Sequence, residues 1–161
     1  MKIEKIPLNK ENLIIIKKID DLYFTEDITD LNWYLDRYTT KHTAYVIKDN
    51  QDNYQGYIIA VPIKKVLYKA ITNGVLINDI NINPDMFVNK SKYHYIASFV
   101  ILEKHRHKGL GLKLIKSIIK LVDKGYYCAL VMSNEGDAIS KKYMHLKKKI
   151  NENVSVYEIK L

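Results

Sequence analysis

The hydrophobic pattern changes most clearly near residue 110, where a strand-like run gives way to helical spacing. The apolar residues 99–102 have the length and β-branched content of a buried strand. After Leu112, apolar residues recur on one helix face, at Leu114, Ile115, Ile118, Ile119 and Val122. The residues between these two patterns are basic and include Gly109 and Gly111. The pattern predicts a buried strand that leads through a basic turn into an amphipathic helix.

The remaining patterns predict a mixed α/β sheet. On the N-terminal side we expect a strand over residues 2–6, helices over 10–21 and 27–38, and a hairpin of strands 43–48 and 54–63. Asn9 offers a cap for the first helix, although residues 14–16 are also strand-like. On the C-terminal side we expect a strand over 126–132, parallel to the strand before the basic turn, a helix through 137–146 and a closing strand over 154–161.

Composition narrows the class of protein. With 161 residues, of which 47% are hydrophobic, the chain predicts one globular domain over residues 1–161. The single cysteine, Cys128, excludes a disulfide framework and a Cys/His metal site, so we expect no metal and a reducing cytoplasmic location. No apolar stretch approaches the roughly 20 residues of a membrane span, so we expect no membrane partner.

The net charge of +8 lies entirely in the C-terminal half of the chain. Residues 1–90 hold 12 basic and 12 acidic side chains, whereas residues 91–161 hold 14 basic and 6 acidic ones. Only Arg37 and Arg106 are arginines, and nucleic-acid readers rely on arginine for base edges, so we expect no nucleic-acid partner. Two interpretations of the lysine excess stay open: a phosphate-bearing ligand, or a solvated face without a partner.

The basic turn has the features of an anion site. The first N–H groups of a helix have no partner within the helix and lie at the positive end of its dipole. Glycines allow a ligand to approach the backbone closely. A dinucleotide fingerprint is excluded because Leu114 stands where its third glycine belongs, and a P-loop is excluded because it requires Gly-Lys-Ser/Thr.

The spacing Arg106-x-x-Gly109-x-Gly111 resembles the acyl-CoA-binding motif of the GCN5-related N-acetyltransferases. This resemblance implies a sheet whose fourth and fifth strands splay around acetyl-CoA. It implies that the pantetheine arm binds along Phe99, Val100 and Ile101. It also implies a pyrophosphate site at Arg106, His107, Lys108, Gly109, Leu110, Gly111 and Leu112. Asn134, four residues before Ala138, is similar to a further element of the family that we assign to the cofactor.

The resemblance implies N-acetyl transfer to an amine by direct attack through a tetrahedral intermediate. Tyr143 stands near the family's thiolate-protonating tyrosine, but Lys142 holds the usual position and residues 147–149 are lysines in place of a Gly-Phe pair. These departures keep open an alternative, a non-catalytic acyl-CoA sensor of the same fold. His94 is a candidate general base, or else an exposed histidine at a strand end. The oxyanion donor is expected to be the N–H of Val100 or Ile101.

The amine acceptor is unknown at this stage. Four acidic residues of the predicted helical pair suit a cationic amine, or else form a solvated face: Glu26, Asp27, Asp30 and Asp36. In the simplest family pattern the third strand turns directly into the fourth, whereas here residues 64–92 lie between them. We therefore predict an inserted connection with a short helix that ends at Gly74. Such an insertion either selects the acceptor or elaborates the packing. A homodimer also stays open.

Overall fold

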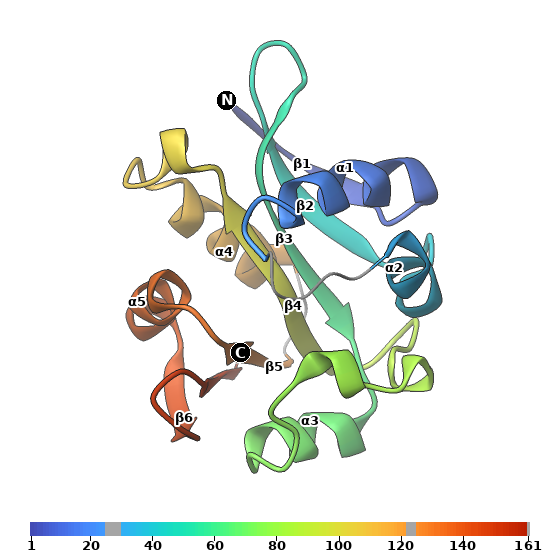
Figure 1. Cartoon of the computed structure of the whole chain (residues 1–161), viewed down its shortest axis with the longest axis vertical. Coiled ribbons are helices and arrows are strands. Elements are labelled where there is room, and N and C mark those ends of the chain that lie inside the picture. Colours follow the sequence, from blue (N-terminus) through green and yellow to red (C-terminus); the bar gives the residue numbers. More distant parts are fainter. Residues whose placement is uncertain (25–29, 122–124, 161) are drawn as a thin grey trace.

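One mixed sheet organises the chain in the computed structural model, which describes residues 1–24, 30–121 and 125–160 (Figure 1). Within these residues the strand order is β1-β2-β3-β4-β5-β7-β6. The strands are β1 (Lys2–Pro7), β2 (Thr43–Lys48), β3 (Tyr54–Pro62), β4 (Tyr93–Ile101), β5 (Tyr126–Val131), β6 (His145–Lys149) and β7 (Ser155–Lys160). Neighbouring strands are antiparallel except β4 and β5, which are parallel as predicted.

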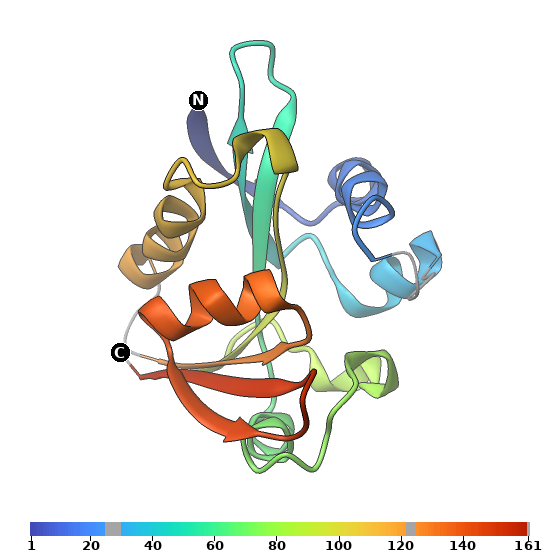
Figure 2. The ribbon, with the colours of Figure 1, turned by 60° about the vertical axis from the view of Figure 1, so that its left-hand side comes forward.

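Helices cover both faces of the sheet. They are α1 (Lys10–Asp20), α2 (Leu31–Arg37), α3 (Lys65–Thr72), α4 (Leu110–Leu121) and α5 (Asn134–Tyr143). Figure 2 shows α1 and α2 on one side of the central strands and α4 on the other. Successive side chains of a strand point to opposite faces of the sheet, so the core has two parts. In β3, Ile59 packs under α1 and α2, whereas Ile58 packs under α4. No helix in the described ranges is long and apolar enough to cross a membrane.

Local sequence explains where the helices begin. The side chain of Asn9 accepts a hydrogen bond from the Asn12 N–H at 2.9 Å and caps α1, as predicted. Asp30 caps α2 in the same way through the Trp33 N–H. Ser133 caps α5 and thereby fixes the turn that follows β5. Each cap satisfies one of the N–H groups that a helix start leaves without an internal partner.

Two predicted boundaries were wrong. The helix expected through residue 146 ends at Tyr143, because Met144 is extended and residues His145–Lys149 form β6 against β7. The pairing gives this lysine-rich segment backbone partners that its side-chain pattern did not indicate. The second helix, expected from residue 27, begins at Leu31, and residues 25–29 lie outside the described part of the chain.

The sheet opens between β4 and β5, which confirms the predicted splay. These strands pair only from Tyr93 to Tyr95, opposite residues 126–128, and then separate. Just beyond that point β4 carries a bulge, because Ile96 pairs with Ala60 and Ser98 with Ile59, which leaves Ala97 without a partner in β3. Past Tyr95, the edge of β4 that faces β5 therefore lacks a paired strand, and its backbone groups face the gap.

The connection between β3 and β4 contains α3 and two 3-10 turns, η1 (Asp79–Asn81) and η2 (Pro84–Met86). Gly74 follows α3 with φ of +70°, which confirms the predicted end of the helix. α3 packs on β4, β5 and β7, on the same face as α1 and α2. Residues 64–92 therefore extend the layer beside α2, up to the gap in the sheet.

Candidate active site

A cavity of about 610 Å³ occupies the gap between β4 and β5. Its lining combines both strands, at Ile96–Phe99 and Ala129–Val131, with residues from both faces of the sheet. Ile115 of α4 and Ile139 of α5 line it on one face, and Tyr34 of α2 lines it on the other. The cavity thus passes through the sheet, which is possible because the splay removes the hydrogen bonds that would otherwise close it.

The predicted anion turn lies at one end of this gap, between the end of β4 and α4. His107 and Gly109 both have left-handed backbones, with φ of +60° and +73°. Such residues, alternating with ordinary ones, turn successive N–H groups toward one side and form an anion-binding concavity. A Cβ built on Gly109 meets no atom within 4 Å, so this glycine borders open space. The turn therefore fits a phosphate group that approaches the start of α4.

The second glycine of the motif has a different role. A Cβ on Gly111 would lie 2.6 Å from Ile139 Cδ1 and 3.1 Å from Phe99 Cζ. Gly111 therefore allows α4 to pack closely on α5 and on β4. Since Phe99 and Ile139 also line the cavity, this close packing sets the width of the gap.

Arg106 links the turn to the sheet. Its Nε donates to the Ile101 carbonyl at 3.2 Å, at the end of β4. Its guanidinium lies 5.1 Å from the centre of the Tyr23 ring and 4.0 Å from the Glu135 carboxylate. Tyr23 in turn accepts a hydrogen bond from the Glu103 N–H at 2.9 Å. Arg106 thus fixes the position of the turn, and its remaining N–H groups add positive charge beside it.

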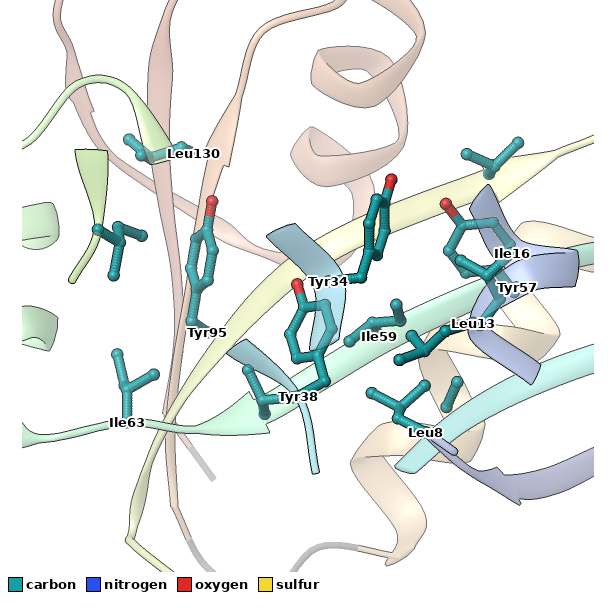
Figure 3. Packing of buried hydrophobic residues seen from close by; sticks show 14 of the residues in the cluster. Leu8, Leu13, Ile16, Tyr34, Tyr38, Tyr57, Ile59, Ile63, Tyr95 and Leu130 are labelled. Carbon is teal, nitrogen blue, oxygen red and sulfur yellow. The ribbon is translucent and has the colours of Figure 1, made fainter. Parts of the chain in front are cut away.

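A buried carboxylate lies on the opposite side of the gap. Asp20, at the end of α1, is 6% exposed and lines the cavity. The Tyr34 hydroxyl donates to its Oδ2 at 2.6 Å, and the Tyr57 hydroxyl donates to its Oδ1. Tyr57 also shares a 2.7 Å hydrogen bond with Ser98 of β4, beside the bulge. Figure 3 shows the hydroxyls of Tyr34 and Tyr57 directed to the same side of the view.

Burial raises the pKa of Asp20 to about 7, and nearby Asp21 adds to the rise. The hydrogen bonds from Tyr34 and Ser98 oppose this shift, since they favour the charged form. The result is a carboxyl group that changes its charge near neutral pH. Groups with this property are often found in active sites.

Aromatic rings and the inserted connection complete this side of the cavity. Trp33, Tyr34 and Tyr38 line it from the α2 segment, together with Asp79 and Ile80 from residues 64–92. One side chain holds the two parts together: the Arg37 guanidinium donates to the carbonyls of Ile80 and Ile82 at 3.1 and 3.0 Å. It also stacks 4.1 Å from the centre of the Trp33 ring. The insertion therefore forms a fixed wall of the cavity.

The two predicted catalytic side chains do not line this cavity. Tyr143 is the last residue of α5 and packs in the core beneath α4, although its neighbours Ser140 and Met144 reach the cavity. His94 is buried where β4 still pairs with β5, and its ring stacks on Tyr127 with centroids 4.7 Å apart. Burial lowers the pKa of His94.

The structure also places Asn134 and two of the four acidic residues that were predicted to bind the amine. Asn134 begins α5 next to the Ser133 cap, beside the carboxyl end of β5. Asp30 caps α2 and Asp36 is exposed, so neither lines the cavity; Glu26 and Asp27 lie outside the described residues. Among the described residues, no three His, Cys, Asp or Glu side chains are placed to hold a metal ion.

Sequence analysis missed Asp20 although a signal was present. Leu13, Ile16 and Asp20 are spaced to share one face of α1, and all three are buried. An aspartate on the apolar face of an amphipathic helix is rarely buried without hydrogen-bond partners. The hydroxyls that satisfy it come from α2 and β3, which no local pattern links to α1.

Solved structures share this architecture along almost their full length. The loading GNATL domain of CurA from Lyngbya majuscula superposes with a TM-score of 0.71 at 12% identity, covering 99% of this chain and 98% of that one. Arabidopsis thaliana Naa50, in complex with the bisubstrate analogue CoA-Ac-MVNAL, gives 0.64 at 15% identity and full coverage of both chains. Arabidopsis thaliana NAA60 in complex with acetyl-CoA gives 0.63 at 14%, covering 99% and 100%. These likenesses establish the fold.

Sequence comparison establishes the family. No curated protein matches the chain. The family model described as the acetyltransferase (GNAT) family matches residues 14–139, a stretch that includes most of α1, the splayed strands, the predicted anion turn and most of α5. The chain therefore belongs to the GNAT acetyltransferase family.

Proposed function

We propose that this chain transfers the acetyl group of acetyl-CoA to a primary amine. The observation that carries the proposal is the cavity through the sheet, which has carboxylates beside α1 and α2 and, on the other side, the lining residues Phe99 and Ile139 that pack against Gly111 of the turn. Such a passage allows a thioester and an amine to meet from opposite faces. Structures with the same fold contain acetyl-CoA or a CoA-linked bisubstrate analogue, which supports the choice of cofactor.

The residues around the passage support a division of roles. The N–H groups of residues 106–112 hold the pyrophosphate at the start of α4, with Gly109 giving it access. The unpaired edge of β4, at Phe99, Val100 and Ile101, binds the pantetheine arm through its backbone. When bound, acetyl-CoA supplies an acyl group that is already activated as a thioester.

Three groups complete the proposed reaction. A backbone N–H of β4 at Val100 or Ile101 donates to the carbonyl oxygen as negative charge develops there. Tyr143 protonates the departing sulfur, a role that requires its hydroxyl to reach the gap from the end of α5. The acceptor binds between Trp33 and Asp79, where the described lining includes carboxylates and aromatic rings but no lysine, arginine or histidine. This lining favours a cationic amine.

A sensor of acyl-CoA with the same fold is the second candidate. It is favoured by the position of Tyr143, which does not line the cavity, and by the lysines at residues 147–149. A cytoplasmic location suits either function, because both depend on acyl-CoA and the buried Cys128 is a free thiol.

Incubating the protein with acetyl-CoA and a panel of primary amines, and reading the release of free thiol, tests the proposal. We expect amine-dependent release for at least one cationic amine, and stabilisation of the protein by acetyl-CoA in thermal-shift titration. Stabilisation without release over the whole panel would favour the sensor. No stabilisation at ligand concentrations far above micromolar would reject both functions.

A further inference from the structure

Asp20 lines the acceptor side of the cavity, and the roles proposed above leave it without a function. We propose that Asp20 is the general base that takes a proton from the ammonium group of a cationic primary amine. This inference rests on the proposed function, since it assigns one step of that reaction. It replaces His94, which is buried where β4 and β5 still pair and does not line the cavity.

The hydrogen bonds around Asp20 hold it at the edge of the gap. Each carboxylate oxygen accepts one tyrosine hydroxyl, from Tyr34 on α2 and from Tyr57 on β3. The two oxygens have four lone pairs between them, and Tyr34, Tyr57 and Ser98 engage at most three, so the carboxylate keeps capacity for a further donor such as an ammonium N–H. Tyr57 continues the network to Ser98, which lines the cavity next to the bulge in β4. The carboxylate is therefore connected, through the Tyr57 hydroxyl, to β4, the strand along which the thioester is expected to bind.

The charges that face Asp20 leave it available to a cation. On its own helix, Asp21 is engaged by Lys17, whose amino group lies 2.7 Å from the Asp21 carboxylate. Lys17 also favours the ionised form of Asp20, but its amino group is held by Asp21. The other described titratable groups next to Asp20 include the tyrosine hydroxyls of Tyr34 and Tyr57 in contact and of Tyr38 nearby. Those hydroxyls are neutral at physiological pH, so none of them neutralises the charge of Asp20.

The walls next to Asp20 suit the rest of such a substrate. The aromatic residues Trp33 and Phe24 line the cavity, and Asp79 of the inserted connection lines it together with Asp20 and Asp21. Aromatic faces attract an ammonium group and also pack against an apolar body. We therefore take the acceptor to be a primary ammonium carried on an apolar or aromatic group.

Burial gives Asp20 the proton affinity that this step needs. It raises the pKa of the carboxyl group to about 7. A base is most effective when its pKa lies near the working pH, because it is then both ionised and a strong enough acceptor. An exposed aspartate, with a pKa of about 3.9, would be ionised but would hold the proton too weakly.

The proposed step balances as follows. Asp20 takes one proton from R–NH₃⁺, and the freed lone pair on nitrogen forms a bond to the thioester carbonyl carbon. The carbon–sulfur bond then breaks and the sulfur leaves with its electron pair. The nitrogen loses a second proton as the amide forms, and the thiolate gains one, through Tyr143 in the proposed mechanism. Asp20 finally releases its proton to solvent.

Asp20→Asn tests the step because it keeps the shape of the side chain and removes the base. With phenethylamine, which is protonated at neutral pH, we expect kcat to fall by roughly 10²- to 10⁴-fold. With O-methylhydroxylamine, which is largely neutral at that pH, the fall should stay within about tenfold, because no proton has to be removed before attack. A purely structural role would lower both rates equally, and that result would overturn the proposal.

Two further variants sharpen the comparison. Tyr34→Phe removes a hydrogen bond that lowers the pKa of Asp20, so the acidic limb of kcat/KM should move to higher pH. Asp36→Asn removes an exposed carboxylate from α2 and should leave the profile unchanged. An unmoved limb in Tyr34→Phe would contradict the assignment.

Binding provides a readout that needs no turnover. In the presence of CoA, phenethylamine should raise the melting temperature of the wild type more at about pH 8 than at about pH 5.5, since only ionised Asp20 attracts the ammonium. The difference between the two pH values should vanish in Asp20→Asn. A pH difference that persists in Asp20→Asn, or none in the wild type, would overturn the proposal. Failure of acetyl-CoA to bind or react with the wild type would count against the proposed function, whereas a reactive wild type with equal losses for both amines in Asp20→Asn would count against Asp20 alone.

Discussion

Replacing Asp20 with asparagine should change how the stability of the protein depends on pH. The pKa of an aspartate in an unfolded chain is about 3.9, and in the folded protein the pKa of Asp20 is about 7. Between these values the folded state holds a proton that the unfolded state has lost, so the free energy of unfolding falls as pH rises. About three pKa units at 1.36 kcal/mol each give a loss of about 4 kcal/mol between about pH 4 and about pH 8.

Chemical denaturation at a series of pH values measures this effect as the difference between wild type and Asp20→Asn. We expect the wild type to lose about 4 kcal/mol relative to the variant across that range. For a chain of 161 residues this corresponds to roughly 10 °C in melting temperature. Carboxylates whose pKa is lowered, such as Glu4 and Asp137, are present in both proteins and cancel in the difference. Parallel curves for the two proteins would refute a raised pKa at Asp20.

Three further predictions concern the cofactor side. Gly109→Ala should cost roughly 1 kcal/mol of stability, because its backbone is left-handed, and should weaken acetyl-CoA binding. Gly111→Val should cost roughly 1–3 kcal/mol of stability, because the new side chain would clash with Ile139. Thermal shifts with and without acetyl-CoA measure both effects, and a larger loss of stability in Gly109→Ala than in Gly111→Val would contradict the prediction. Arg106→Ala should weaken acetyl-CoA binding about tenfold or more, as measured by calorimetry. The wild type should bind duplex DNA only weakly, and less as salt is added. Tight duplex binding at physiological salt would contradict the assignment of the basic turn to acetyl-CoA. Tyr143→Phe should lower kcat by roughly 10²- to 10⁴-fold and leave acetyl-CoA affinity unchanged, and a rate within a few-fold of wild type would remove Tyr143 from the mechanism.

The fold could be predicted in large part because its signals are local. Strand β2 was predicted with its observed bounds, and the Asn9 cap and the end of α3 at Gly74 follow from residue types within a few positions. The parallel pairing of β4 and β5 follows from the strand, helix, strand order. β6 was not predicted because its side chains are exposed and mostly lysines, so they show no strand pattern. Only the backbone pairing with β7 identifies this segment as a strand.

One side of the candidate site has local sequence signals, and the other side does not. The turn between β4 and α4 lies within one short segment, so its spacing was enough to predict a turn there, and its role as a phosphate site stays a prediction. The acceptor side is assembled from α1, α2, β3 and residues 64–92, and its central carboxylate is identified only when Tyr34 and Tyr57 are brought next to Asp20. The role assigned to Tyr143, like the single domain over residues 1–161, stays a prediction, and the role first assigned to His94 is proposed for Asp20 instead.

The passage through the sheet has a consequence for the order in which ligands bind. Among its described lining residues, Phe24 and Asn78 are exposed on the side of α1, α2 and residues 64–92, and Met132 and Ser133 are exposed at the end of β5. If the amine and acyl-CoA enter from these two ends, as proposed, neither ligand has to cross the path of the other, and a ternary complex can assemble in either order. Initial-rate kinetics should therefore give intersecting lines. An inhibitor that joins the two ligands would need a linker that passes through the gap between β4 and β5.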